Sequence, residues 1–213
     1  MVVRARGRSR SGHGFTLIEL MIVVAIVGIL AVLAIYGVRK YLANAKTAEA
    51  RNSLGQIAKD AATAYERESM TTSVLPVGSQ AGLSRTVCGG VSDSVPSITI
   101  GGAYAVSGNK YQSDPGEWNI DAAGNSGFAC LKFSMDQPQY YLYRYYTSTT
   151  PLGSSLGSFS TPACGNVGCS FGALAMGDLN GDKVFSEFTI QGTINSSYAL
   201  NIAPNIGEVS PDE

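Results

Sequence analysis

The chain has 213 residues, of which 45% are hydrophobic and 15% charged, with a formal charge of −1. This length suits one anchored helix and one globular domain of ordinary size. From residue 70 onward there are five basic and eleven acidic residues, which argues against electrostatic capture of nucleic acid by this region, because such binding needs a basic surface.

The N-terminus combines a basic stretch with a charged residue at the start of an apolar run. Arginines stand at positions 4, 6, 8 and 10, and no acid precedes Glu19. After Glu19 come sixteen uncharged residues, Leu20–Ile35. A carboxylate within an apolar segment is costly to place in lipid, so we expect Glu19 to have a partner or a function.

Two ordinary explanations fit this N-terminus poorly. A cleaved secretory signal has an apolar region of about 7–15 residues, whereas Phe15–Val38 is longer and contains Glu19. A plain membrane anchor fits the length, since 24 residues at ~1.5 Å each reach ~36 Å across a ~30 Å hydrocarbon core. Arg4–Arg10 would then hold the N-terminus in the cytoplasm. The anchor alone gives Glu19 no role.

The stretch Gly14-Phe15-Thr16-Leu17-Ile18-Glu19-Leu20-Met21-Ile22-Val23-Val24-Ala25-Ile26 resembles the class III signal of type IV prepilins and pseudopilins. The resemblance implies that a prepilin peptidase cuts between Gly14 and Phe15 and methylates the new amino terminus on Phe15. It also implies that Glu19 pairs with the Phe15 amine of a neighbouring subunit. The physics agrees, because a buried carboxylate beside an ammonium is favoured over an unpaired one.

The same resemblance implies the fold and the function. It implies an α+β pilin fold, in which a long N-terminal helix packs on an antiparallel β-sheet head, and a structural subunit that polymerises into a type IV pilus. Minor pilins, pseudopilins of type II secretion and a membrane-anchored extracellular binding domain are the alternatives. The implied partners are copies of this chain, prepilin peptidase and the inner-membrane assembly machinery. The subunit would lie in the inner membrane before assembly and in a surface filament afterwards.

No enzyme or cofactor is expected. The one histidine, His13, would leave with the leader, so histidine-dependent catalysis is excluded in the mature chain. The sequence contains no P-loop and no dinucleotide-binding glycine pattern. The mature chain keeps eleven basic and sixteen acidic residues, a formal charge of −5.

The sequence divides into five segments. Residues 1–14 form the leader, 15–38 the apolar helix, 39–69 its amphipathic continuation, 70–96 a connecting loop and 97–213 the β-sheet head. We expect one continuous helix of roughly 50 residues, because the apolar spacing at Leu54, Ile57, Ala61 and Tyr65 continues the helical period. Many major pilins have a proline where Tyr36-Gly37 stands here.

Period-two patterns predict the strands of the head. We expect an irregular tail from Asn201, and a hairpin at Asp136-Gln137-Pro138. The predicted strands are Ser97–Ile100, Ala103–Ser107, Trp118–Asp121, Phe128–Met135, Gln139–Thr147, Phe171–Gly177 and Val184–Ile194.

Four cysteines stand in the region expected outside the cytoplasm, where disulfides persist. They are Cys88, Cys130, Cys164 and Cys169. Three pairings are possible. The short Cys164–Cys169 loop favours a local bridge, which leaves Cys88 with Cys130. A metal site is less favoured, because no Cys-x-x-Cys pair occurs.

Asp178, Asn180 and Asp182 place oxygen ligands at alternate positions, as at the start of a calcium loop, and Ser186 and Glu187 follow. The sixth position is Lys183 instead of glycine, and the twelfth is Thr189 instead of glutamate. The alternative is a plain hairpin turn, since Asn-Gly between apolar runs is typical of a type I′ turn.

Five tyrosines crowd the predicted strand Gln139–Thr147. Alternation places Tyr141, Tyr143 and Tyr145 on one face, and Tyr140, Leu142, Arg144 and Tyr146 on the other. Exposed aromatic residues could stack on sugars, on another subunit or on a surface. We favour a strand with a core face and a tyrosine-lined outer face, which needs no ligand.

Overall fold

The computed structural model describes residues 14–67, 77–78, 85–100, 103–147 and 171–211. The chain forms two compact units, residues 1–42 and 43–213, and each is described by itself. Helix α1, Leu17–Glu66, contributes to both units. Its 50 residues agree with the expected length of the helix.

The first unit consists of the apolar part of α1. None of the α1 side chains before Thr47 is buried. Leu17 is 78% exposed and Ile29 63% exposed. Among the described residues, α1 is the one helix that is long and apolar enough to cross a membrane. This segment therefore needs an apolar environment that the monomer does not supply.

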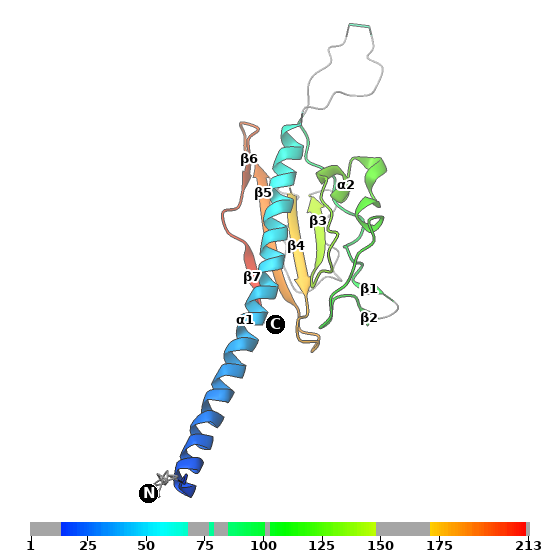
Figure 1. Ribbon diagram of the computed structural model, residues 1–213. Coiled ribbons are helices and arrows are strands. Elements are labelled where there is room, and N and C mark those ends of the chain that lie inside the picture. The colour runs from blue at the N-terminus through cyan, green and yellow to red at the C-terminus, as the bar shows by residue number, and fades with distance from the viewer. Residues whose placement is uncertain (1–13, 68–76, 79–84, 101–102, 148–170, 212–213) are drawn as a thin grey trace, which may run out of the picture. The chain divides into compact units, whose positions relative to one another are not determined.

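The second unit is an antiparallel sheet with one face packed against the second part of α1 (Figure 1). The sheet has five strands, and its central path runs β3-β4-β5-β6. These strands are β3 Leu142–Thr147, β4 Phe171–Gly177, β5 Ser186–Ile194, β6 Leu200–Ile202 and β7 Gly207–Val209. Strand β7 pairs with the beginning of β5, and β6 with its end. The fold is α+β, as the sequence predicted.

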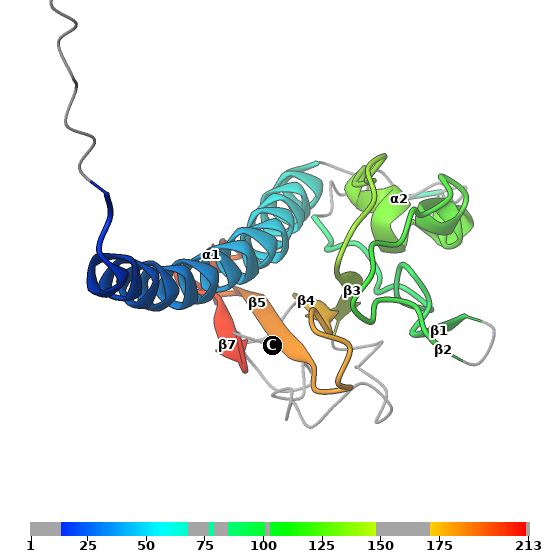
Figure 2. The same ribbon diagram turned by 60° about the horizontal axis from the view of Figure 1, so that its bottom comes forward.

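The helix and the sheet meet in one hydrophobic core. Ala50, Leu54 and Ile57 of α1 are completely buried in it. From the sheet come three tyrosines of β3 and its approach, together with Phe171 and Phe188. Strand β4 is buried along its whole length. Figure 2 shows the strands foreshortened, with the second part of α1 along one face of the sheet.

The tyrosine alternation is correct, but the face of β3 opposite α1 is not an exposed outer face as expected. Tyr141, Tyr143 and Tyr145 are 0% exposed and belong to the core beside α1. Leu142 and Tyr146, on the opposite face, are each 1% exposed. The alternation showed which tyrosines share a face, but it did not show that both faces are covered.

The sequence predicted β4 correctly, and β3 and β5 nearly so. Elsewhere the predicted strands were partly wrong. Residues 127–131 form a short helix, α2 Gly127–Leu131, and Trp118 lies in the 3-10 helix η1 Glu117–Asn119. The expected hairpin at residues 136–138 is therefore absent from the described chain. The tail is not irregular either, because it supplies β6 and β7.

The remaining small elements lie on the β3 side of the sheet (Figure 1). They are β1 Thr99–Ile100, β2 Ala103–Tyr104 and the 3-10 helix η2 Ala122–Gly124. The outer edge of β3 is paired, because Val95 and Tyr143 exchange backbone hydrogen bonds and Val91 N–H donates to Tyr145 O. This pairing removes an open edge that would invite association with another strand.

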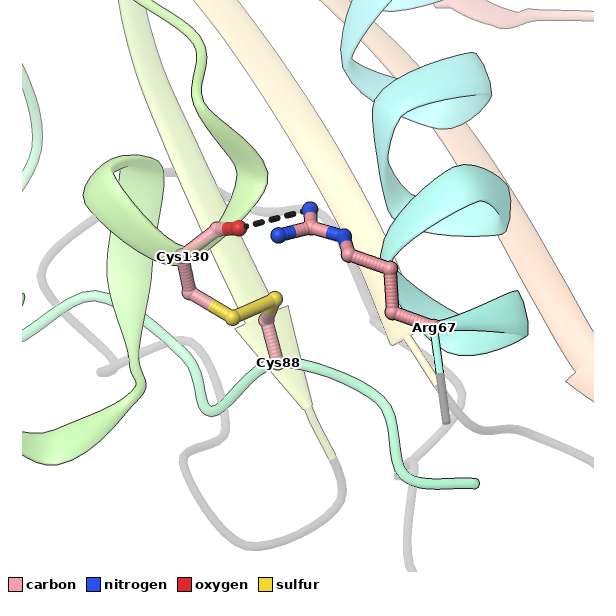
Figure 3. Close-up of a disulfide and its surroundings, with 3 residues drawn as sticks. All are labelled: Arg67, Cys88 and Cys130. Carbon is pink, nitrogen blue, oxygen red and sulfur yellow. Dashed lines mark hydrogen bonds between the residues drawn. A yellow bond between two sulfur atoms is a disulfide. The ribbon is translucent and has the colours of Figure 1, made fainter. Parts of the chain in front are cut away.

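A disulfide joins Cys88 to Cys130, as the sequence analysis favoured. It connects the segment that follows α1 to α2 across 42 positions of sequence. In Figure 3 the Arg67 guanidinium lies beside it and donates to Cys130 O at 2.9 Å. Cys164 and Cys169 lie outside the described residues.

Candidate functional site

The first turn of α1 holds the carboxylate that the sequence singled out. Two donors of Thr16, its backbone N–H and its hydroxyl, bind Glu19 Oε2 at 2.9 and 2.6 Å. In return, Glu19 N–H donates to Thr16 Oγ1 at 3.3 Å. The other carboxylate oxygen, Oε1, has no hydrogen-bond partner among the described residues.

This reciprocal arrangement is a capping box, Thr-x-x-Glu. It satisfies backbone N–H groups that the first turn of a helix leaves without partners. It also explains why α1 begins at Leu17, directly after Thr16. Sequence reasoning missed Thr16, although the spacing of Thr16 and Glu19 before an apolar run is the usual pattern of a capping box.

Gly14 and Phe15, the residues of the expected cleavage site, precede the helix. Phe15 is 78% exposed. A Cβ atom at Gly14 would meet no atom within 4 Å, and the Gly14 backbone does not require glycine. Among the described residues, neither packing nor backbone conformation requires glycine at this position. Cleavage after Gly14 and methylation of Phe15 stay predictions.

In the structure, the predicted oxygen ligands Asp178, Asn180 and Asp182 belong to a wide turn between β4 and β5. The connection between β4 and β5 runs from Asp178 to Phe185, so it is not the two-residue turn that the sequence offered as the alternative. Asp178 Oδ1 accepts Gly181 N–H at 2.6 Å, and Asp178 Oδ2 accepts Lys183 N–H at 3.0 Å. Local side-chain bonds of this kind hold a turn open in place of strand pairing.

Asp178 is 1% exposed, and Ser107 Oγ also donates to its Oδ2 at 2.8 Å. Burial acts to raise the pKa of Asp178, but the hydrogen bonds from Ser107, Lys183 and Gly181 outweigh it and lower that pKa. Asn180 and Asp182 are exposed and bond to each other. Within the described ranges, no three His, Cys, Asp or Glu side chains group closely enough to hold a metal ion. Calcium binding at this turn stays a prediction.

A second carboxylate joins α1 to the sheet. Glu49 Oε1 accepts Tyr140 N–H at 2.8 Å and lies 3.5 Å from Tyr143 Oη. Lys46 and Lys110 each place an ammonium 4.7 Å from the centre of the Tyr140 ring. Burial raises the pKa of Glu49, and the hydrogen bond from Tyr140 and the charge of Lys110 oppose that rise.

Comparisons with known proteins agree with the features of the N-terminus. Residues 9–35 match the family model described as the prokaryotic N-terminal methylation motif. The chain is 61% identical over 42 residues to the type IV major pilin protein PilA of Myxococcus xanthus, a match that spans 19% of that protein and 20% of this chain.

A second relative matches over a longer stretch. Fimbrial protein Q of Moraxella bovis is 35% identical over 117 residues, which cover 74% of that protein and 52% of this chain. No solved structure matches the chain. The similarity to both relatives is thus a similarity to pilus and fimbrial proteins.

Proposed function

The chain belongs to the type IV pilin family, and we propose that it is a structural subunit of a type IV pilus that polymerises through its N-terminal helix into a surface filament. The observation that carries the proposal is the first unit itself. It is an apolar helix with every described side chain exposed and a single, locally capped carboxylate at its start.

The exposed apolar surface of α1 would serve the subunit both in the inner membrane and in the filament. Burying one Val, Leu or Ile side chain is worth about 1.5–3 kcal/mol, and many such side chains are exposed on α1 between Leu17 and Val38. In the inner membrane, lipid would cover them. In the filament, the same side chains would pack against the helices of neighbouring copies, with close approach at Gly28.

Glu19 would set the register of the subunits. Its Oε2 is occupied by Thr16, and its Oε1 has no partner among the described residues. Oε1 is therefore available to an ammonium group from outside the monomer. The amine of Phe15 in a neighbouring subunit would supply it, but only after cleavage at Gly14 by prepilin peptidase creates that amine. The pair is then desolvated in the filament core, where an unpaired carboxylate would be costly.

Two substitutions of Glu19 separate its charge from its capping role. Glu19→Ala removes both roles and should lower the yield of pili in sheared surface fractions while the protein still inserts into the membrane. Glu19→Gln keeps an acceptor that serves in a capping box but has no charge. If pairing with an amine drives assembly, this variant should also assemble poorly.

The matched control is Thr16→Val, which weakens the cap and keeps the charge. A pilus yield near that of the unsubstituted protein from Glu19→Ala or Glu19→Gln would contradict the pairing. Membrane flotation of each variant shows whether lost pili reflect lost insertion instead.

Processing is tested at Gly14. Since a Cβ there meets nothing, Gly14→Ala should leave the local structure unchanged. We expect an unprocessed precursor, which mass spectrometry of the N-terminus would show as a chain still carrying residues 1–14. A mature N-terminus at Phe15 in this variant would show that cleavage does not depend on Gly14.

The abundance of the protein in purified filaments distinguishes a major subunit from a minor pilin or a secretion pseudopilin. A binding domain that stays anchored in the membrane would instead keep its leader and remain absent from filaments. The proposed role needs copies of the chain, the peptidase and the inner-membrane assembly machinery, but no cofactor.

A further inference from the structure

Four residues near the end of the first unit form a group that polymerisation does not explain. Tyr36, Arg39, Lys40 and Tyr41, which we call the collar, occupy two consecutive turns of α1. Tyr36 is 69% exposed and Tyr41 73% exposed, and both cationic side chains are exposed. Neither Arg39 nor Lys40 forms an ion pair with any described residue.

The collar lies one membrane thickness from the start of the helix. The rise from Leu17 to Tyr36 is about 28 Å at ~1.5 Å per residue, close to the ~30 Å of a hydrocarbon core. Lys40 follows about 6 Å further along, within the depth of the headgroup region. If the capped end of α1 lies at one interface, the collar lies at the other.

The composition of the collar matches that position. Tyrosine prefers the membrane–water interface because its ring is apolar and its hydroxyl is polar. From Leu20 to Ala48 the chain has three cations and no acid, although the mature chain is acidic as a whole. Of these cations, Lys46 lies over the Tyr140 ring, which leaves Arg39 and Lys40 as the pair without a partner among the described residues.

We propose that the collar binds the phosphate groups of anionic lipids and so fixes the depth of the subunit in the membrane before assembly. This inference rests on the membrane-inserted stage of the proposed function. At ~100° per residue, the four side chains spread over more than half of the helix circumference. Lipid surrounds a helix, whereas a docking protein meets one side of it, so the spread favours lipid over an acidic patch of a second copy.

The test uses the full mature chain carrying Tyr36→Trp, in vesicles of phosphatidylcholine and phosphatidylglycerol in which one lipid or the other is brominated. Bromine quenches tryptophan at contact, so the ratio of the two quenching curves measures which lipid surrounds the collar. Trp118 is 2% exposed in the head and adds a constant background, measured on the chain without Tyr36→Trp. We expect phosphatidylglycerol to be preferred by up to roughly 25-fold, because each of the two basic residues near an anionic surface contributes about a factor of five.

Arg39→Gln with Lys40→Gln should bring the preference to about one, and so should high salt, which screens the attraction. The control pair, Lys59→Gln with Lys132→Gln, removes the same charge from the second unit and should leave the preference unchanged. Equal quenching by both lipids in the unsubstituted chain, or an equal loss in the control pair, would overturn the inference.

Two further outcomes separate this proposal from others. If Arg39→Gln with Lys40→Gln lowers filament yield but leaves the lipid ratio unchanged, the collar binds a second copy and the lipid proposal is wrong. If neither brominated lipid quenches the tryptophan, the helix is not inserted, and the membrane stage of the proposed function fails instead.

Discussion

Two aromatic rings of the sheet lie over glycines on neighbouring strands. Phe171 pairs with Gly192 and Tyr146 with Gly172 in the strand register. A Cβ built on either glycine would collide with the ring of its partner. These glycines thus serve packing in the sheet, because a side chain there would displace a buried ring.

Gly192→Ala should therefore destabilise the head. Phe171 is 0% exposed, and its ring would have to move within a packed core, which costs about 1–3 kcal/mol in the free energy of unfolding. Urea denaturation in detergent, followed by the fluorescence of Trp118, measures that free energy.

The matched control is Gly55→Ala, at an exposed position of α1 where a Cβ meets nothing within 4 Å. Alanine is favoured over glycine in a helix by up to about 1 kcal/mol, so this variant should be more stable. If Gly192→Ala leaves the free energy of unfolding unchanged or raises it, as Gly55→Ala should, the packing argument at Gly192 is wrong.

Glu49 predicts a dependence of stability on pH. Burial raises its folded-state pKa above the ordinary value of 4.5, so the unfolded chain ionises at a lower pH than the folded one. The free energy of unfolding should therefore fall as the pH rises from about 4.5 through the raised pKa, and then level off.

Glu49→Gln removes this contribution while keeping an acceptor for Tyr140 N–H. The difference in free energy of unfolding, variant minus parent, should grow in favour of the variant across that pH window. A difference that stays constant with pH, measured by denaturation at several pH values, would contradict the assignment.

At the scale of the elements, the sequence predicted what depends on local periodicity. Apolar spacing alone predicts helix α1 and strands β3, β4 and β5. The alternation that includes Tyr141 and Tyr143 predicts which side chains in and next to β3 share a face. Strands β6 and β7 have three residues each and form only by pairing with β5. Pairing with a distant strand leaves no periodic pattern in so short a segment.

The short helix α2 could not be predicted from periodicity either. Five residues are too few to distinguish a period of 3.6 from a period of 2. Its ends depend on left-handed backbone at Gly127 (φ 65°) and Lys132 (φ 64°). Its position depends on the disulfide at Cys130 and on Phe128, whose ring packs edge-on against Trp118 at 4.9 Å.

The candidate site was predictable to a similar degree. The motif predicts roles for Gly14, Phe15 and Glu19 in cleavage and assembly, and these stay predictions. It assigned Glu19 only a charge that needs a partner. The capping box with Thr16 gives the same carboxylate a local role in starting α1. At Asp178, spacing alone did not separate a metal ligand from a turn, because both uses place carboxylate oxygens on the same side of a loop.

At the scale of the whole molecule, the second unit depends on contacts between segments far apart in sequence. Arg51 pairs with Glu208 at 2.8 Å, and Tyr65 donates to Tyr198 O at 3.0 Å. Both pairs join the second part of α1 to the end of the chain. The exposed ion pair contributes little by itself. We therefore expect the hydrophobic core and the disulfide to contribute more to the stability of this unit than this ion pair does.

The covalent link gives the last prediction. Closing a loop of 42 positions stabilises a fold by about 4 kcal/mol in the chain-entropy model, so Cys88→Ser with Cys130→Ser should lower the free energy of unfolding by roughly 2–4 kcal/mol. Trp118 is the only tryptophan in the chain and contacts Phe128, two residues from Cys130, so its fluorescence reports on this region during urea denaturation. Arg67→Gln is the control, because it removes the hydrogen bond to Cys130 O, keeps the disulfide and should cost about 1 kcal/mol or less. If the two variants unfold at the same urea concentration, the disulfide stabilises the head no more than a single hydrogen bond does.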